Sequence, residues 1–355
     1  MIRRWETNDL PEIIQIWNQS VESGEVLNYP LTADYFHTKF EMDPNYDPEL
    51  FLVAEDGGRI VGFIGGTAKK IFLDHENNET TPGYLTCLFV REECRGRGIG
   101  RLLADALCDR FRAMGKALTA VRDANPIQMD WRIPGTPGHD HNNMPGVDTE
   151  SPGYGFLRAI GFHETDREVA MYLNLRDYVP WEGLKRKQEE LLAQGIYTGP
   201  YDAALDYDYD RACDRVKSDY WRESIRSEIT CWKENRPNTD TRFIPNGTQI
   251  PAGPRTMLVA THDRHIVAFT GPVDKQQSGR GWFTGIFTDP EFEHRGIAPV
   301  LFNLLMQEFI AEGAAFSTLF TGGDNRAQRI YLRTGFRPVR TFAVMEKDLK
   351  SNFPG

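Results

Sequence analysis

Gly83-Tyr-Leu-Thr-Cys-Leu-Phe-Val90 is followed by Arg95-Gly-Arg-Gly-Ile-Gly100 and then by an amphipathic segment over residues 101–114. The apolar run predicts a buried strand, and the helical spacing of leucines after it predicts a helix. Glycines let a backbone turn tightly and approach an anion, and the N–H groups at a helix N-terminus attract that anion. The loop is therefore a candidate pyrophosphate site, with added positive charge from Arg95, Arg97 and Arg101.

The same order of segments returns in the second half of the chain. Trp282–Thr288 corresponds to the strand at Gly83–Val90, and Arg295-Gly-Ile-Ala298 precedes a helix expected over Pro299–Ala311. Gly98 and Gly296 are 198 residues apart (296 − 98), whereas Gly161 and Gly335 are 174 apart (335 − 161). The difference of 24 residues (198 − 174) predicts an insertion in the first copy, and the Pro/Gly-rich stretch 125–152 is expected to form it as a long loop.

The repeat predicts a duplicated domain rather than a solenoid, whose repeats are about 20–50 residues long. We expect a first domain over 1–176 with its insertion at about 125–152, and a second domain over 201–355. A connecting segment over 177–200 carries a charged stretch, Glu182–Gln194, that is expected to be helical and to stop at Gly195.

Both copies resemble one known family. Arg95-x-x-Gly98-x-Gly100 is similar to the R/Q-x-x-G-x-G/A motif of the GCN5-related N-acetyltransferases, the GNAT superfamily. The order of elements in each half also resembles that family, and the pair resembles tandem acetyltransferases of the mycothiol-synthase type. The resemblance implies an α/β (α+β) fold of two GNAT-like domains, each with a mixed, mostly antiparallel central sheet flanked by helices.

The resemblance also implies acetyl-CoA as a cosubstrate and a splayed central strand whose N–H groups face the pantetheine arm and the thioester. The second loop departs from the motif, because Glu293 stands where Arg or Gln is expected. The residues expected beside the cosubstrate are, in the first half, Leu88, Phe89, Val90, Arg95, Gly96, Arg97, Gly98, Ile99, Gly100 and Arg101, and, in the second half, Phe287, Thr288, Arg295, Gly296, Ile297 and Ala298.

The expected catalytic residues lie in the second half. Asp324-Asn-Arg-Ala327-x-x-x-Tyr331-x-x-x-Gly335-Phe336 resembles the family's N-x-x-A-x-x-x-Y-x-x-x-G-F element, in which the tyrosine lies near the CoA sulfur as a general acid. The first half has Leu157 at the position of Tyr331. We therefore expect chemistry in the second half, with Tyr331 as acid and Asp324 as a candidate base. The alternative places the chemistry in the first half and gives the second half a structural role.

The general base stays open, because neither central strand holds the carboxylate that many members of the family carry there. A water relay, Asp324, or the first-half loop His139-Asp140-His141 could serve. The same stretches also allow plain structural explanations: Tyr331 as a packed helix aromatic, and the histidines as a loop without a role.

Composition narrows the function classes. The 355 residues carry a net charge of −10, which argues against nucleic acid and against a basic membrane-binding surface. No apolar run is long enough to span a membrane, the start lacks a signal peptide, and five scattered cysteines predict no metal site and a reduced, cytoplasmic setting. We expect transfer of an acetyl group to a primary amine of a small molecule by direct attack in a ternary complex. A non-catalytic acyl-CoA-binding or sensing protein is the competing class, and the sequence specifies neither the acceptor nor the oligomeric state.

Overall fold

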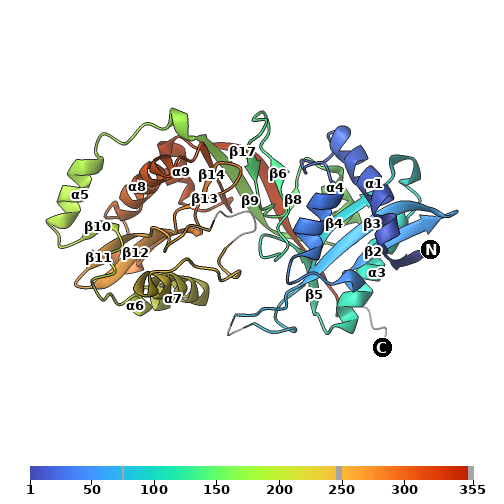
Figure 1. Ribbon diagram of the computed structural model, residues 1–355, viewed down its shortest axis with the longest axis horizontal. Coiled ribbons are helices and arrows are strands. Elements are labelled where there is room, and N and C mark those ends of the chain that lie inside the picture. Colours follow the sequence, from blue (N-terminus) through green and yellow to red (C-terminus); the bar gives the residue numbers. More distant parts are fainter. Residues whose placement is uncertain (74–75, 245–249, 351–355) are drawn as a thin grey trace. The chain divides into compact units, whose positions relative to one another are not determined.

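A computed structural model describes residues 1–73, 76–244 and 250–350. The chain forms two compact units (Figure 1). The first unit contains residues 1–169 together with 340–355, and the second contains residues 170–339. The predicted division along the sequence, at 177–200, stays a prediction about the duplicated segments.

The first unit is built on one mixed sheet. Its strand order is β1-β2-β3-β4-β5-β17, antiparallel except for the parallel pair β4–β5. Its elements in chain order are β1 (Ile2–Arg4), α1 (Leu10–Glu22), α2 (Ala33–Phe36), β2 (Phe51–Asp56), β3 (Arg59–Ala68), β4 (Gly83–Val90), α3 (Ile99–Ala113), β5 (Leu118–Val121), β6 (Trp131–Arg132), β7 (Asp140–His141), β8 (Val147–Asp148), α4 (Pro152–Ala159) and the start of β9 (His163–Asn174).

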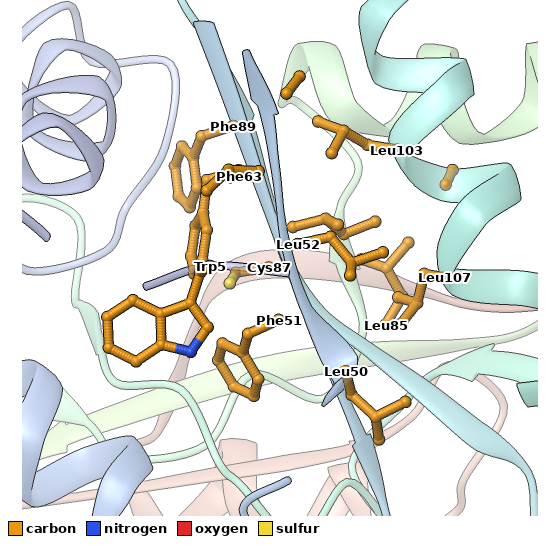
Figure 2. Packing of buried hydrophobic residues seen from close by; sticks show 14 of the residues in the cluster. Trp5, Leu50, Phe51, Leu52, Phe63, Leu85, Cys87, Phe89, Leu103 and Leu107 are labelled. Carbon is orange, nitrogen blue, oxygen red and sulfur yellow. The ribbon is translucent and has the colours of Figure 1, made fainter. Parts of the chain in front are cut away.

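Helices cover both faces of this sheet, because its strands are apolar on both sides (Figure 2). Phe51, Phe63 and Phe89 lie on one face, where Trp17 of α1 packs against Phe89 with ring centroids 4.4 Å apart. On the opposite face Leu52 and Leu85 meet Leu103 and Leu107 of α3. These side chains form the hydrophobic core that holds β4 in place.

The second unit repeats this plan with a divided central strand. One set of strands has the order β10-β11-β12-β15, and another has the order β9-β16-β14-β13. The elements are the end of β9, α5 (Leu184–Leu192), β10 (Tyr197–Pro200), α6 (Asp210–Val216), α7 (Asp219–Glu234), β11 (Leu258–His262), β12 (His265–Gly271), β13 (Asp274–Lys275), β14 (Arg280–Trp282), β15 (Gly285–Thr288), α8 (Ile297–Ala311), β16 (Phe316–Gly322), α9 (Gln328–Thr334) and the start of β17 (Arg337–Asp348).

The predicted single strand over Trp282–Thr288 is wrong, because two strands stand there. β14 pairs in parallel with β16, and β15 pairs antiparallel with β12. The chain changes partners between them, at residues 283–284, so neither strand runs through. The prediction of Gly83–Val90 as one strand is confirmed.

Packing under the motif helix is the same in both copies, which supports the duplication. A Cβ on Gly83 would lie 2.4 Å from the ring of Phe111, and a Cβ on Gly281 would lie 2.6 Å from the ring of Phe309. No side chain fits at either glycine, because real Cβ contacts are not this short. The same close approach of strand and helix therefore occurs at equivalent positions.

The last strand of each sequence copy runs from one unit into the other. β9 begins in the first unit and ends in the second, whereas β17 begins in the second and ends in the first. Within the first unit β17 pairs antiparallel with β5, at Met345↔Val121, and with β8, at Ala343↔Val147. The first sheet is thus completed by residues from the end of the chain.

The stretch 125–152, predicted as a long loop, is an ordered part of the first unit. It contains β6, β7 and β8, and its side chains Ile127, Met129 and Trp131 are buried. Trp131 packs edge-on against Phe342 of β17, with ring centroids 5.1 Å apart. Polar and Pro/Gly-rich composition hid these short strands, which depend on contacts distant in sequence.

Candidate functional site

The central strand β4 and its parallel neighbour β5 diverge in the first unit. They pair only at Gly83↔Thr119 and Tyr84↔Ala120 among the described residues, and beyond this point β4 continues alongside β3 alone. A pocket of about 480 Å³ lies where the strands part. Leu85–Val90, the loop at Arg95–Gly100 and Phe156 of α4 line it, and its lining is mainly apolar.

The glycine loop at one end of the pocket has the geometry of an anion site. Gly96 and Gly98 adopt left-handed conformations, with φ of +73° and +82°, and Gly98 is the N-cap of α3. As a glycine, the N-cap residue has no side chain that could cap this helix. The first-turn N–H groups therefore lack partners inside the helix and remain available to an anion.

Arg95 lines the pocket and is held by partners within the protein. Its guanidinium contacts the Glu25 carboxylate at 2.5 and 2.8 Å, and its Nε donates to the Val90 carbonyl at 3.0 Å. Glu25 raises the pKa of Arg95, and Arg95 lowers the pKa of Glu25. Arg97 and Arg101 are exposed beside the loop, and Arg101 donates to the Ala159 carbonyl at 3.0 Å.

The second copy has the same loop conformation with different chemistry. His294 and Gly296 have φ of +62° and +85°, so His294 takes the strained position that Gly96 fills in the first copy. The side chain of Lys187 on α5 lies over Gly296, where an added Cβ would be 2.6 Å from Lys187 Cε. Arg295 stacks over the ring of Phe292. Ile297 and Ala298 already belong to α8, which therefore begins two residues before the helix expected over Pro299–Ala311.

Tyr331 and Asp324 lie at opposite levels of burial. Tyr331 is on α9, 6% exposed, and its ring is 5.0 Å from that of Phe302 and 6.3 Å from that of Phe336. Burial raises its pKa to about 12, so the phenol stays protonated at neutral pH. Asp324 is exposed in the turn before α9. Phe287 and Thr288 lie on β15. The catalytic roles given to Tyr331 and Asp324 stay predictions.

The imidazole of His141 and the thiol of Cys87 are both buried, in surroundings that do not favour catalysis. His141 is 1% exposed and stacks on Trp131, with ring centroids 5.6 Å apart, so its imidazole belongs to the packing of the insertion. Cys87 lines the pocket, and burial raises its pKa to about 12. A thiol with that pKa is a poor nucleophile near neutral pH.

The insertion contributes pocket residues that the motifs did not indicate. Met144, Gly146, Val147 and Asp148 line the pocket, although they belong to a stretch expected to be a loop. Gly146 is required there, because a Cβ would lie 2.3 Å from the Ala343 carbonyl oxygen. The pairing of β8 with β17 places these residues at the pocket, and neither strand has a sequence pattern that predicts this pairing.

Residues 1–73, 76–244 and 250–350 contain no helix that combines the length and the apolar character needed to cross a bilayer. The same residues form no group of three or more histidine, cysteine, aspartate or glutamate side chains arranged to hold a metal ion.

Comparison with known proteins identifies the class. The model of the acetyltransferase (GNAT) family matches residues 11–130 and 214–336, which together are more than half of the chain. The chain therefore belongs to the acetyltransferase (GNAT) family, and it matches the family model twice. The predicted tandem GNAT architecture is confirmed.

Curated relatives match about a third of the chain. An uncharacterized N-acetyltransferase of Methanocaldococcus jannaschii is 32% identical over 107 residues, which are 30% of this chain and 56% of that protein. An acetyltransferase of Photorhabdus laumondii subsp. laumondii is 32% identical over 114 residues, which are 32% of this chain and 68% of that protein. The chain thus spans little more than half of the first relative.

Solved structures match over both copies. A GCN5-related glucosamine N-acetyltransferase region of a fungal multi-domain GH3 β-N-acetylglucosaminidase has a TM-score of 0.61 at 16% identity, covering 98% of this chain and 38% of that chain. A tandem GNAT protein from the clavulanic acid biosynthesis pathway has a TM-score of 0.57 at 14% identity and covers both chains fully. At these identities the likeness defines the fold alone.

Proposed function

We propose that this protein transfers an acetyl group from acetyl-CoA to a primary amine of a small molecule, and that the transfer takes place in the first unit. The observation that carries the proposal is one pocket that joins the glycine loop to the diverging edge of β4. The glycine loop would bind the phosphates of acetyl-CoA, and the diverging edge of β4 would bind its thioester. The second unit has a lysine over its glycine loop and an acidic residue at the motif's first position.

The loop provides the phosphate end of the site. N–H groups at the start of α3, at Ile99 and Gly100, and the side chains of Arg97 and Arg101 would hold the pyrophosphate. Arg95 and Glu25 keep the loop in shape. The apolar lining suits the pantetheine arm, and Phe156, Leu157 and Ile160 near the end of α4 contribute to it.

The edge of β4 provides the thioester end. Beyond Tyr84 this edge has lost its β5 partner, so backbone N–H groups among Leu88–Val90 are available to a ligand carbonyl. An N–H group aimed at the carbonyl oxygen stabilises the oxyanion that forms when the amine attacks. Attack in a ternary complex then needs no covalent enzyme intermediate, which agrees with the protonated state of Cys87.

The competing division of labour keeps chemistry in the second unit, with Tyr331 and Asp324 as acid and base. The buried, ring-packed surroundings of Tyr331 support a structural role instead. A non-catalytic acyl-CoA-binding protein shares the pocket but has no use for a carboxylate beside the thioester, and Asp148 lines the pocket.

Calorimetric titration with acetyl-CoA and continuous measurement of free thiol with a panel of primary amines test the proposal. We expect saturable binding, and thiol release that depends on both the protein and one class of amine, with the acetylated amine detected by mass spectrometry. Tight binding without thiol release for any amine would support the sensor instead. Absence of binding would contradict both.

A further inference from the structure

We propose that Asp148 is the proton acceptor for the attacking amine in the first unit, held in place by Arg340 from the end of the chain. This role rests on the proposed function, because it requires acetyl transfer in that pocket. No sequence motif marks Asp148, which lies in the insertion at the end of β8. The argument rests on strand register, on the contacts of the carboxylate and on the other charges of the pocket.

Strand register places Asp148 across from the thioester end of the pocket. β5 ends at Val121, which pairs with Met345 of β17, and β8 then pairs with the same strand at Ala343↔Val147 and Phe342↔Asp148. Both β5 and β8 run antiparallel to β17, so β8 continues the line of β5 after the insertion. The insertion thus supplies, through β8, the side of the pocket that β5 would form if it continued beyond Val121.

The register also fixes the level of Asp148 along β4. Tyr84 pairs with Ala120, and Ala120 pairs with Glu346 of β17. Phe342, the partner of Asp148, lies four positions further along β17 (346 − 342). Four positions beyond Tyr84 on β4 is Leu88, the first of the residues proposed to face the thioester. Asp148 and Leu88 both line the pocket.

The contacts of Asp148 orient its Oδ1, whereas Oδ2 has no hydrogen-bond partner among the described residues. Oδ1 accepts the N–H of Glu150 at 3.0 Å and lies 3.2 Å from Nε of Arg340. No hydrogen bond to Oδ2 occurs among the described residues, and the side chain is 9% exposed. A carboxylate fixed through one oxygen can present the other to an amine.

The charges around Asp148 favour proton uptake while keeping the group ionisable. Burial raises the pKa of Asp148, and Arg340 acts in the opposite direction. The side chain of Glu150 also faces Asp148 and is mostly exposed. On α4, the charged group of Arg158 lies over the ring of Tyr154. The hydroxyl of Tyr154 donates to Glu164.

The other charged groups of β17 and of the pocket have partners elsewhere. On β17, Glu346 pairs with Arg122 and Lys347 with Asp105, and Arg337 lies over the ring of Tyr172 in the second unit. Of the two carboxylates that line the pocket, Glu25 is held by both terminal nitrogens of Arg95. Asp148 is therefore the pocket carboxylate with an oxygen available for a substrate.

The step is balanced without a further reactant. The nitrogen lone pair of the neutral amine bonds to the thioester carbon, and the C–S bond breaks as the tetrahedral intermediate collapses. One proton passes from the amine nitrogen to Oδ2 of Asp148, and the CoA thiolate takes a proton from water. Asp148 returns its proton to the hydroxide that remains, so the products are the amide and CoA thiol.

The test compares full-length Asp148→Asn with wild type and with Glu150→Gln, the other carboxylate that contacts Arg340. Asparagine keeps the acceptor for the Glu150 N–H, so the local turn is preserved. We expect Asp148→Asn to lower kcat at least 100-fold, the usual range for loss of a general base, with KM for acetyl-CoA within threefold of wild type. Glu150→Gln should stay within twofold.

The pH profile separates a catalytic from a structural role. In wild type, log kcat/KM for the amine should fall on the acidic side with a slope of about two, one proton on the amine itself and one on Asp148, and in Asp148→Asn only the slope of about one from the amine should remain. Asp148→Glu should recover part of the rate. An Asp148→Asn variant that keeps kcat within threefold and the same acidic slope as wild type would overturn the role of Asp148 while leaving the acetyl transfer intact. A wild-type protein that binds acetyl-CoA and acetylates no amine would overturn both.

Discussion

Phe342 pairs with Asp148 in the first unit, although Phe342 belongs to the last strand of the chain. The wall of the first pocket opposite β4 is therefore held by β17. Neighbouring pairs extend this contact to β5, at Met345↔Val121 and Glu346↔Ala120. The two sequence copies consequently cannot be treated as independent halves.

Truncation tests this dependence. A chain that ends at residue 339 keeps every predicted cosubstrate residue of the first half but lacks the strand that pairs with β5 and β8. We expect it to lose acetyl-CoA binding by calorimetry, or to be insoluble. A chain that ends at residue 350 keeps the whole of β17 and should bind as the full chain does. Equal binding by both truncations would contradict the assigned role of β17.

Acetyl-CoA should bind once per chain. Glu293 repels an anion at the second loop, and the side chain of Lys187 occupies the space over Gly296. At the first loop the first-turn N–H groups have no partner inside α3. Calorimetry should give a stoichiometry near one, which Gly98→Glu abolishes and Gly296→Glu leaves unchanged. A stoichiometry near two would contradict this asymmetry.

Glu168 should make stability depend on pH. Burial and, to a smaller extent, the nearby Asp123 together raise its pKa to about 7, and its Oε2 is buried without a hydrogen-bond partner in the described part of the chain. The folded state thus binds a proton that the unfolded state releases near pH 4, and stability falls as pH rises from about 4 to about 7.

Removing that carboxylate should therefore stabilise the protein on the alkaline side. We expect Glu168→Gln to raise the free energy of unfolding by about 1–2 kcal/mol at pH 8 and to leave it unchanged at pH 4, as judged by urea denaturation. A gain of the same size at both pH values would show that the effect is not a proton linkage.

A buried ion group stabilises the second unit. The guanidinium of Arg255 is 1% exposed and pairs with Glu228 and Asp274, which are equally buried. Arg255→Ala leaves two carboxylates without their cation and should lower the free energy of unfolding by about 3–5 kcal/mol. Arg222→Ala, whose partners Asp210 and Asp214 are exposed, should cost less than about 1 kcal/mol. Similar losses in the two variants would refute this ranking.

Local patterns predicted the motif elements well. The strand at Gly83–Val90 and the helix after it are set by apolar spacing and by a glycine loop, all within 32 consecutive residues (83–114), and the structure has both. The repeat carried the same inference to α8. The family and its tandem arrangement followed from these residues alone.

The pairing of strands that are distant in the sequence could not be predicted from local patterns. The exchange of β9 and β17 between units leaves each strand with an ordinary apolar pattern, so nothing in the sequence reports its partner. The two-residue strand β8 is too short for any periodicity, yet it brings Asp148 to the pocket. The ion pair between Arg95 and Glu25 likewise joins residues 70 positions apart.

Thiol release from acetyl-CoA, measured with the amine that wild type accepts, tests the central claim most directly when Gly98→Glu is compared with Tyr331→Phe. Gly98→Glu places a carboxylate where the first loop would hold phosphate, whereas Tyr331→Phe keeps the packed ring and removes only the hydroxyl. Chemistry in the first unit predicts that Gly98→Glu loses at least 100-fold in rate and that Tyr331→Phe stays within twofold of wild type. A large loss in Tyr331→Phe together with near wild-type turnover in Gly98→Glu would contradict it and return the reaction to the second unit.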